Sequence, residues 1–143
     1  MTTKKQVIGG PLSIGGRVLS LSRAIRAGDF VFLTGQVPLE DGKPMTHGTI
    51  EEQTRVVIEA IRETLAEAGC NLGDVVKAMV WLSERADFPG FNAVYAEYFP
   101  VDPPVRSAVI SELLVDVRVE IEVIAFRPPN ATSRVAPGGD PRL

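Results

Sequence analysis

Apolar residues recur along this chain with two different periods, and each period predicts a kind of element. Over residues 50–68 they fall three and four positions apart, which is the spacing of a helix that buries one side. Thr49 and Glu52 match the capping box that begins many helices, and Gly69 suits the position that ends them. The pattern therefore predicts an amphipathic helix that packs on a sheet.

A second helical segment follows, and it is aromatic rather than aliphatic. Asp87 could cap its N-terminus, Pro89 is tolerated in the first turn, and Pro100 stops it. Its apolar positions predict a buried stripe of Phe88, Phe91, Val94, Tyr95, Tyr98 and Phe99. These residues, together with Trp81, are expected to belong to the core.

Apolar segments without the helical period predict the strands. They cover residues 17–25, 30–34 and 75–82, and two segments within 103–126. The order β-β-α-β-α-β-β predicts an α/β (α+β) fold with one sheet and two helices on one face. Residues 30–34 and 75–82 are apolar on both faces, however, so the face without helices is expected to be buried in a homo-oligomer.

Glycine, proline and charge dominate the segments between these elements. Residues 1–16 are expected to form an irregular lead-in, and residues 38–48 a loop. The chain has 143 residues, enough for one domain, which is expected to span residues 1–127. Residues 128–143 have the composition of a flexible tail.

The last strand alternates in character with a period of two. Val117, Val119, Ile121, Val123 and Ala125 share one face, and Arg118, Glu120, Glu122, Ile124 and Phe126 share the other. The apolar set is expected under the helices, which turns Glu120 and Glu122 toward the subunit interface. Glu122 is expected to be structural and to pair with Arg118.

Arg106 is the other charge placed inside a predicted strand. Two prolines precede it by two and three positions, and they hold the chain extended and limit the directions of its side chain. A guanidinium held in this way suits bidentate binding of a substrate carboxylate. A structural salt bridge between Arg106 and one of the glutamates explains the pattern equally well, so the residues alone leave both interpretations open.

Composition narrows the classes of function. The net charge of -3 argues against a protein that binds nucleic-acid backbones. No export signal and no apolar run of membrane-spanning length is present, so a cytoplasmic location without a membrane partner is expected. The single cysteine excludes an internal disulfide and a cysteine-based metal cluster.

Four segments resemble the signature stretches of the RidA/YjgF family, the reactive-intermediate deaminases. They are residues 32–38 (FLTGQVP), 91–99 (FNAVYAEYF), 104–107 (PVRS) and 119–125 (VEIEVIA). The resemblance implies a chorismate-mutase-like fold and a homotrimer with active sites between subunits. It also implies hydrolysis of 2-imino acids, such as 2-iminobutanoate and 2-iminopropanoate, to 2-oxo acids and ammonia, with no metal and no organic cofactor.

The resemblance also assigns roles to individual positions. Arg106 matches the arginine that binds the substrate carboxylate, and Glu120 the glutamate that positions or activates the attacking water. Further substrate-binding positions are implied at Thr34, Gly35, Asn92 and Ala108. Catalysis would then need a positioned water and a proton acceptor, because an imine is already electrophilic.

Two residues depart from the family pattern. Leu21 stands where many members have a tyrosine that enters the site, and Arg23 stands where they have glutamine. Leu21 is therefore expected to line the pocket and to alter the range of substrates. Two other functions compete with deamination: a regulatory module that binds small carboxylates such as 2-oxo acids without turnover, and, more weakly, a ribonuclease.

Overall fold

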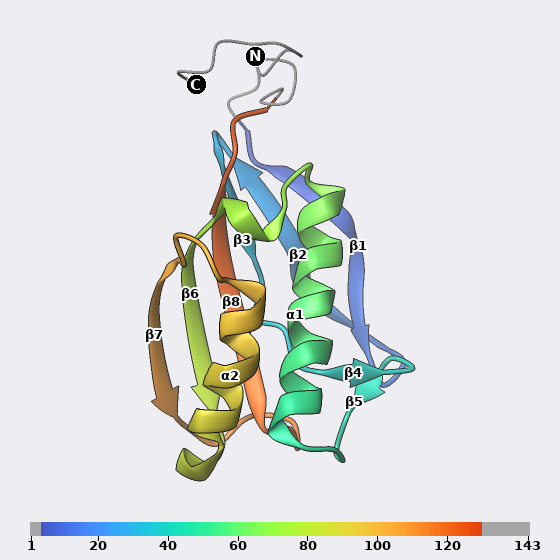
Figure 1. The fold of residues 1–143 in the computed structure, drawn as a ribbon. Coiled ribbons are helices and arrows are strands. Elements are labelled where there is room, and N and C mark those ends of the chain that lie inside the picture. The colour runs from blue at the N-terminus through green and yellow to red at the C-terminus, as the bar shows by residue number, and fades with distance from the viewer. Residues whose placement is uncertain (1–3, 130–143) are drawn as a thin grey trace.

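The strands form one six-stranded sheet in the order β1-β2-β3-β8-β6-β7, with a separate pair β4-β5 (Figure 1). This is a computed structural model, and it describes residues 4–129. The sheet strands are β1 (Gln6–Ile14), β2 (Arg17–Ala27), β3 (Phe30–Leu33), β6 (Val75–Leu82), β7 (Val105–Ile110) and β8 (Val119–Phe126). The predicted tail extends into residues 130–143, which lie outside the described part.

Two helices, α1 (Ile50–Glu67) and α2 (Phe88–Tyr98), lie side by side on one face of the sheet (Figure 1). Single 3-10 turns precede β6 and α2, namely η1 (Leu72–Asp74) and η2 (Arg85–Asp87). The predicted class, a mixed sheet with two helices on one face, is confirmed. We call the face of the sheet that carries no helix the open face.

Two segments expected to be irregular form strands, so those expectations were wrong. Residues 6–14 form β1, which pairs with β2 through partners such as Ile8 and Ala24. Irregular register around Pro11 and a positive φ of 77° at Gly9 accommodate the glycines and the proline within the strand. Residues 38–48 contain the short strands β4 (Leu39–Glu40) and β5 (Lys43–Pro44). Each of these three strands depends on a pairing partner, which local composition does not specify.

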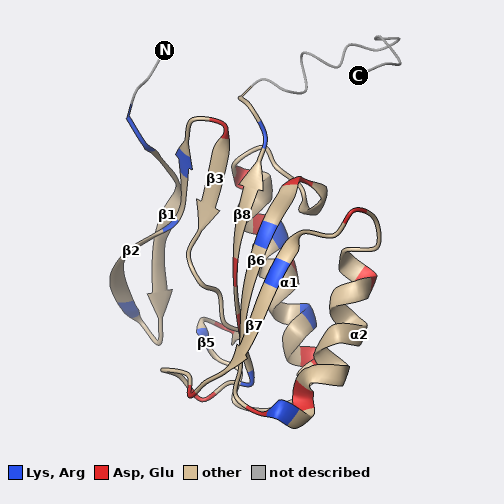
Figure 2. Cartoon of the chain, turned by 90° about the vertical axis from the view of Figure 1, so that its left-hand side faces the viewer, with Lys and Arg blue, Asp and Glu red and all other residues tan. Residues whose placement is uncertain are grey.

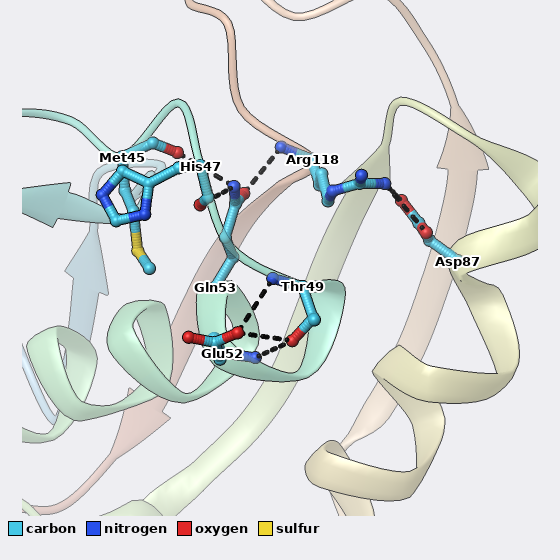
Figure 3. A network of polar contacts seen from close by, with 7 residues as sticks. All are labelled: Met45, His47, Thr49, Glu52, Gln53, Asp87 and Arg118. Atoms are coloured by element: carbon cyan, nitrogen blue, oxygen red, sulfur yellow. Dashed lines mark hydrogen bonds and ion pairs between the residues drawn. The ribbon is translucent and has the colours of Figure 1, made fainter.

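Helix α1 begins and ends as its sequence predicts. The Glu52 amide donates to Thr49 Oγ1 at 3.1 Å, and the Thr49 amide donates to Glu52 Oε1 at 3.2 Å (Figure 3). Gly69 follows the C-cap with a φ of 77°, the left-handed conformation that glycine adopts without strain. The capping box and the termination signal are both confirmed.

The side chain of Gln53 joins α1 to two other segments. Its Nε2 donates to the carbonyls of Met45 at 2.9 Å and His47 at 3.0 Å, and its Oε1 accepts from the Arg118 amide at 2.8 Å (Figure 3). Gln53 is only 2% exposed, so water does not replace these bonds readily. One buried amide therefore fixes both the loop before α1 and the chain that enters β8.

Helix α2 differs in two details from its prediction. Asp87 occupies the N-cap position, but its carboxylate makes no capping bond and accepts from Arg118 Nη1 at 3.0 and 3.2 Å (Figure 3). The expected pairing of Arg118 with Glu122 is therefore wrong. Phe88 is 39% exposed, so it lies outside the core that the other aromatic residues enter.

The alternation of β8 is confirmed and divides the whole sheet. Val119, Ile121, Val123 and Ala125 are buried beneath the helices, whereas Glu120 and Glu122 pair with Trp81 and Met79 on the open face. Trp81 therefore lies on the open face rather than in the core. Large apolar side chains on this face remain partly exposed: Phe30 (42%), Phe32 (43%), Phe126 (43%), Val105 (68%) and Val109 (44%).

We expect Gln53→Leu to lower the free energy of unfolding by about 2–3 kcal/mol, because it leaves two carbonyls and one amide without a partner. Urea unfolding at fixed protein concentration measures this change. Gln6→Leu, at an exposed glutamine, is the matched control and should change the free energy by less than about 0.5 kcal/mol. Equal effects of the two substitutions would contradict the structural role of Gln53.

Candidate active site

Arg106 extends from β7 toward α2. Its neighbour in the parallel pairing is Ala78 of β6, which is fully buried beneath the helices, so Arg106 lies on the helix-covered face. The guanidinium carbon lies 4.8 Å from the ring centroid of Tyr95, 5.5 Å from that of Phe91 and 5.8 Å from that of Phe88. We call these three rings the aromatic shelf. Cation–π attraction to the shelf holds the guanidinium in place.

The contacts of Arg106 are with rings and not with carboxylates. Among residues 4–129 it makes no hydrogen bond and no ion pair, and it remains exposed. The structural salt bridge to Glu120 or Glu122 is therefore not formed within the protomer. The N–H groups of Arg106 remain available to a carboxylate ligand.

A cavity of about 400 Å³ opens beside the aromatic shelf. Its lining residues are Leu82, Arg85, Phe88, Ala108, Val109 and Ile110. Ala108 is two positions after Arg106 and points to the same side of the strand. Asn92 is half-buried on α2, one helical turn after Phe88. We call Arg106, Ala108 and Asn92 the arginine group.

Glu120 lies on the open face against Gly35. A Cβ built on Gly35 would collide with Glu120 Oε2, so only glycine leaves room for this carboxylate as it stands. Thr34, directly before Gly35, is half-buried, and its amide donates to the carbonyl of Arg23 at 3.0 Å. We call Thr34, Gly35 and Glu120 the glutamate group.

The environment of Glu120 raises its pKa above the ordinary value for a glutamate. The larger cause is burial, which disfavours the charged carboxylate, and the smaller is repulsion from Glu122 on the same strand face. A carboxyl group with a raised pKa accepts a proton more readily near neutral pH than an ordinary glutamate does. This property suits a group that exchanges a proton with water or substrate.

The two groups face opposite sides of the sheet. Arg106 is on the helix-covered face of β7, Glu120 is on the open face of β8, and β6 lies between them. Charged positions are few on these three strands, as Figure 2 shows. Leu21 lies on β2, 39% exposed and outside both groups. One protomer therefore does not bring Arg106 and Glu120 to a common ligand.

Sequence reasoning missed two residues near Arg106. Phe88 was assigned to the core, although its spacing of three and seven positions to Phe91 and Tyr95 could have indicated one aromatic surface. Arg85 lines the cavity and carried no sequence signal.

Within residues 4–129, no group of three or more histidine, cysteine, aspartate or glutamate residues is arranged to hold a metal ion. No helix in that part of the chain combines the length and apolar character needed to cross a membrane.

Residues 17–127 match the model of a protein family described as Endoribonuclease L-PSP. A RutC family protein of Pyrococcus abyssi is 45% identical over 74% of this chain and 85% of its own. The chloroplastic Reactive Intermediate Deaminase A of Arabidopsis thaliana is 35% identical over 87% of this chain and 67% of its own. The 3-aminoacrylate deaminase RutC of Acinetobacter baylyi is 38% identical over 71% of this chain and 82% of its own.

Solved structures agree with these sequence matches. The crystal structure of yeast Mmf1 superposes with a TM-score of 0.79 at 34% identity, covering 87% of this chain and 99% of the yeast chain. The structure of Escherichia coli TdcF with bound serine gives a TM-score of 0.75 at 29% identity, covering 85% of this chain and 98% of that one. The similarity therefore extends over nearly the whole length of these structures.

We expect Glu122→Gln to lower the pKa of Glu120 toward its ordinary value without reaching it, because burial, the larger cause, remains. Carboxyl-selective NMR titration measures the change, and Glu112→Gln, at an exposed position, is the control. Between the ordinary and the raised pKa the folded chain binds more protons than the unfolded chain. Stability should therefore fall as pH rises through this window, and fall less in Glu122→Gln. An unchanged or higher pKa of Glu120 in Glu122→Gln would contradict this account.

Proposed function

Because this chain belongs to the Endoribonuclease L-PSP family, which is the RidA/YjgF family, we propose that it hydrolyses reactive 2-imino and enamine acids to 2-oxo acids and ammonia. Substrates of the 2-iminobutanoate and 2-iminopropanoate type are included. The names of the Arabidopsis and Acinetobacter relatives support a deaminase. The observation that carries the proposal is Arg106, an arginine on an aromatic shelf without an acidic partner in the described protomer.

Arg106 would bind the substrate carboxylate. The shelf contacts the guanidinium through ring faces, which leaves its N–H groups free for two parallel hydrogen bonds to a carboxylate. The cavity beside it, partly apolar and lined by Phe88 and Ala108, has room for a short side chain. Bound serine in the related TdcF structure, a ligand that also carries a carboxylate, supports this class of substrate.

Glu120 would exchange the protons of the reaction. Water adds to the carbon of the protonated imine and gives up a proton to the Glu120 carboxylate, which yields a carbinolamine with one hydroxyl and one amino group. The proton then passes from Glu120 to the amino nitrogen. Ammonia leaves as the hydroxyl oxygen becomes the carbonyl oxygen, and the hydroxyl proton returns to Glu120, which releases it to ammonia or water. The raised pKa of Glu120, caused first by burial and then by Glu122, favours these transfers near neutral pH.

Both residues can reach one substrate only if two copies of the chain meet. Arg106 and Glu120 face opposite sides of the sheet, so Arg106 of one protomer would face Glu120 of its neighbour. The partly exposed Phe30, Phe32 and Phe126 supply the apolar surface that such an interface would bury. We propose a homotrimer with the sites between subunits, without nucleic-acid or membrane partners, and in the cytoplasm.

We expect Arg106→Ala to lower kcat/KM for imino acids by about two orders of magnitude, since each charge-assisted hydrogen bond contributes roughly 1.5–3 kcal/mol. The imino acids are generated in the assay by an amino-acid oxidase, and the rate is measured above the uncatalysed background. Arg62→Ala is the matched control, because Arg62 also lies over a ring, that of Tyr98 at 5.4 Å, outside both groups. It should retain full activity.

Three outcomes would contradict the proposal. Full activity in Arg106→Ala would remove Arg106 from the site. Binding of 2-oxo acids without any rate enhancement in the unaltered protein would indicate a non-catalytic carboxylate-binding module. RNA cleavage that disappears with Arg106→Ala would support the ribonuclease that the family's description names, although the net charge of -3 argues against it.

A further inference from the structure

A second cavity of about 400 Å³ lies between α1 and the strands β1 and β2. It is at the β1 edge of the sheet, whereas Arg106 is on β7 at the opposite edge (Figure 1). Much of its lining is apolar, from Leu12, Val37, Leu39, Val56 and Ala60. Its volume is within the range of about 300–1,000 Å³ that small-molecule sites occupy. The cavity is therefore large enough for a small metabolite.

Arg23 brings an unpartnered cation to this cavity. Its Nε is buried and has no hydrogen-bond partner, and within residues 4–129 its guanidinium makes no ion pair. Glu67 approaches the same region, since its carboxylate and the Arg23 Cδ both lie within 4 Å of the position of a Cβ on Gly9, but the two do not pair. A charged guanidinium with a buried N–H that lacks an acceptor is unfavourable, and an anionic ligand beside the guanidinium would offset this cost.

Two of the other charged residues that line the cavity already have partners. Arg55 pairs with Glu97 at 2.8 Å, and Glu59 accepts a hydrogen bond from the Tyr98 hydroxyl at 2.8 Å. Glu63 has neither an ion pair nor a hydrogen bond to any described residue. The cavity thus presents one available guanidinium, one available carboxylate and an apolar wall.

We propose that this cavity binds a small aliphatic α-amino acid. The carboxylate would accept hydrogen bonds from Arg23, the ammonium group would donate to Glu63, and the alkyl chain would lie on Leu12, Val56 and their apolar neighbours. A zwitterion satisfies both charges at once, which neither a plain carboxylate nor an amine does. The site is separate from the arginine and glutamate groups, so it does not depend on the proposed deaminase activity.

Calorimetric titration of the full chain with L-leucine tests the proposal. We expect Arg23→Gln, which installs the residue that the family pattern has at this position, to weaken leucine binding at least tenfold. Glu63→Gln should weaken binding of leucine but leave binding of 4-methylpentanoate, which lacks the ammonium group, unchanged. Arg106→Ala should bind leucine as the unaltered chain does, and Arg23→Gln should keep its rate of imine hydrolysis.

Four results would overturn the proposal. They are no leucine binding by the unaltered chain at millimolar concentration, equal binding by Arg23→Gln, loss of binding in Arg106→Ala, and equal affinity of the unaltered chain for leucine and 4-methylpentanoate. The third result would place leucine in the candidate active site instead. Because imine hydrolysis is measured separately in Arg23→Gln, failure of this second site is distinguishable from failure of the deaminase.

Discussion

The two-residue period of the central strands is the constraint on which the rest of this structure depends. Burial of Val119, Ile121 and Val123 beneath the helices obliges Glu120 to point to the open face. The pairing of β7 with β6 in the same sheet makes Arg106 point toward the helices. A shift of one residue in β8 would exchange its two faces and expose the core. Stability of the protomer therefore separates the two charges.

This separation of the two charges links the open face to the proposed function. In the proposed function, the Arg106 guanidinium on one side of the sheet and the Glu120 carboxylate, with its raised pKa, on the other are two half-sites rather than one site. The partly exposed Phe30, Phe32 and Phe126 lie on the same open face as Glu120, and the aromatic shelf supports Arg106. Association of copies would bury the apolar surface and complete the site in the same step, which links assembly to activity.

Local signals explain what the sequence could predict. The capping box of Thr49 and Glu52, the stripe of α1 and the alternation of β8 depend on residues that are close in the sequence, and each is confirmed. Pairings between distant residues do not depend on such local patterns. The strand β1, the bond between Asp87 and Arg118, and the place of Trp81 on the open face all depend on which segments meet in space. To predict the directions of Arg106 and Glu120 relative to one another, one would have needed the register across three strands. The roles of Thr34, Gly35, Asn92, Ala108 and Leu21 in substrate binding stay predictions.

Complementation between Arg106→Ala and Glu120→Gln, two variants expected to have low activity, tests the central claim most directly. Arg106→Ala and Glu120→Gln are each purified and assayed, then unfolded and refolded together so that their subunits mix. If the site joins Arg106 of one copy to Glu120 of the next, random mixing leaves both residues intact in about a quarter of the sites, and about a quarter of the full activity should return. Mixed oligomers no more active than the separate variants would contradict a site shared between subunits.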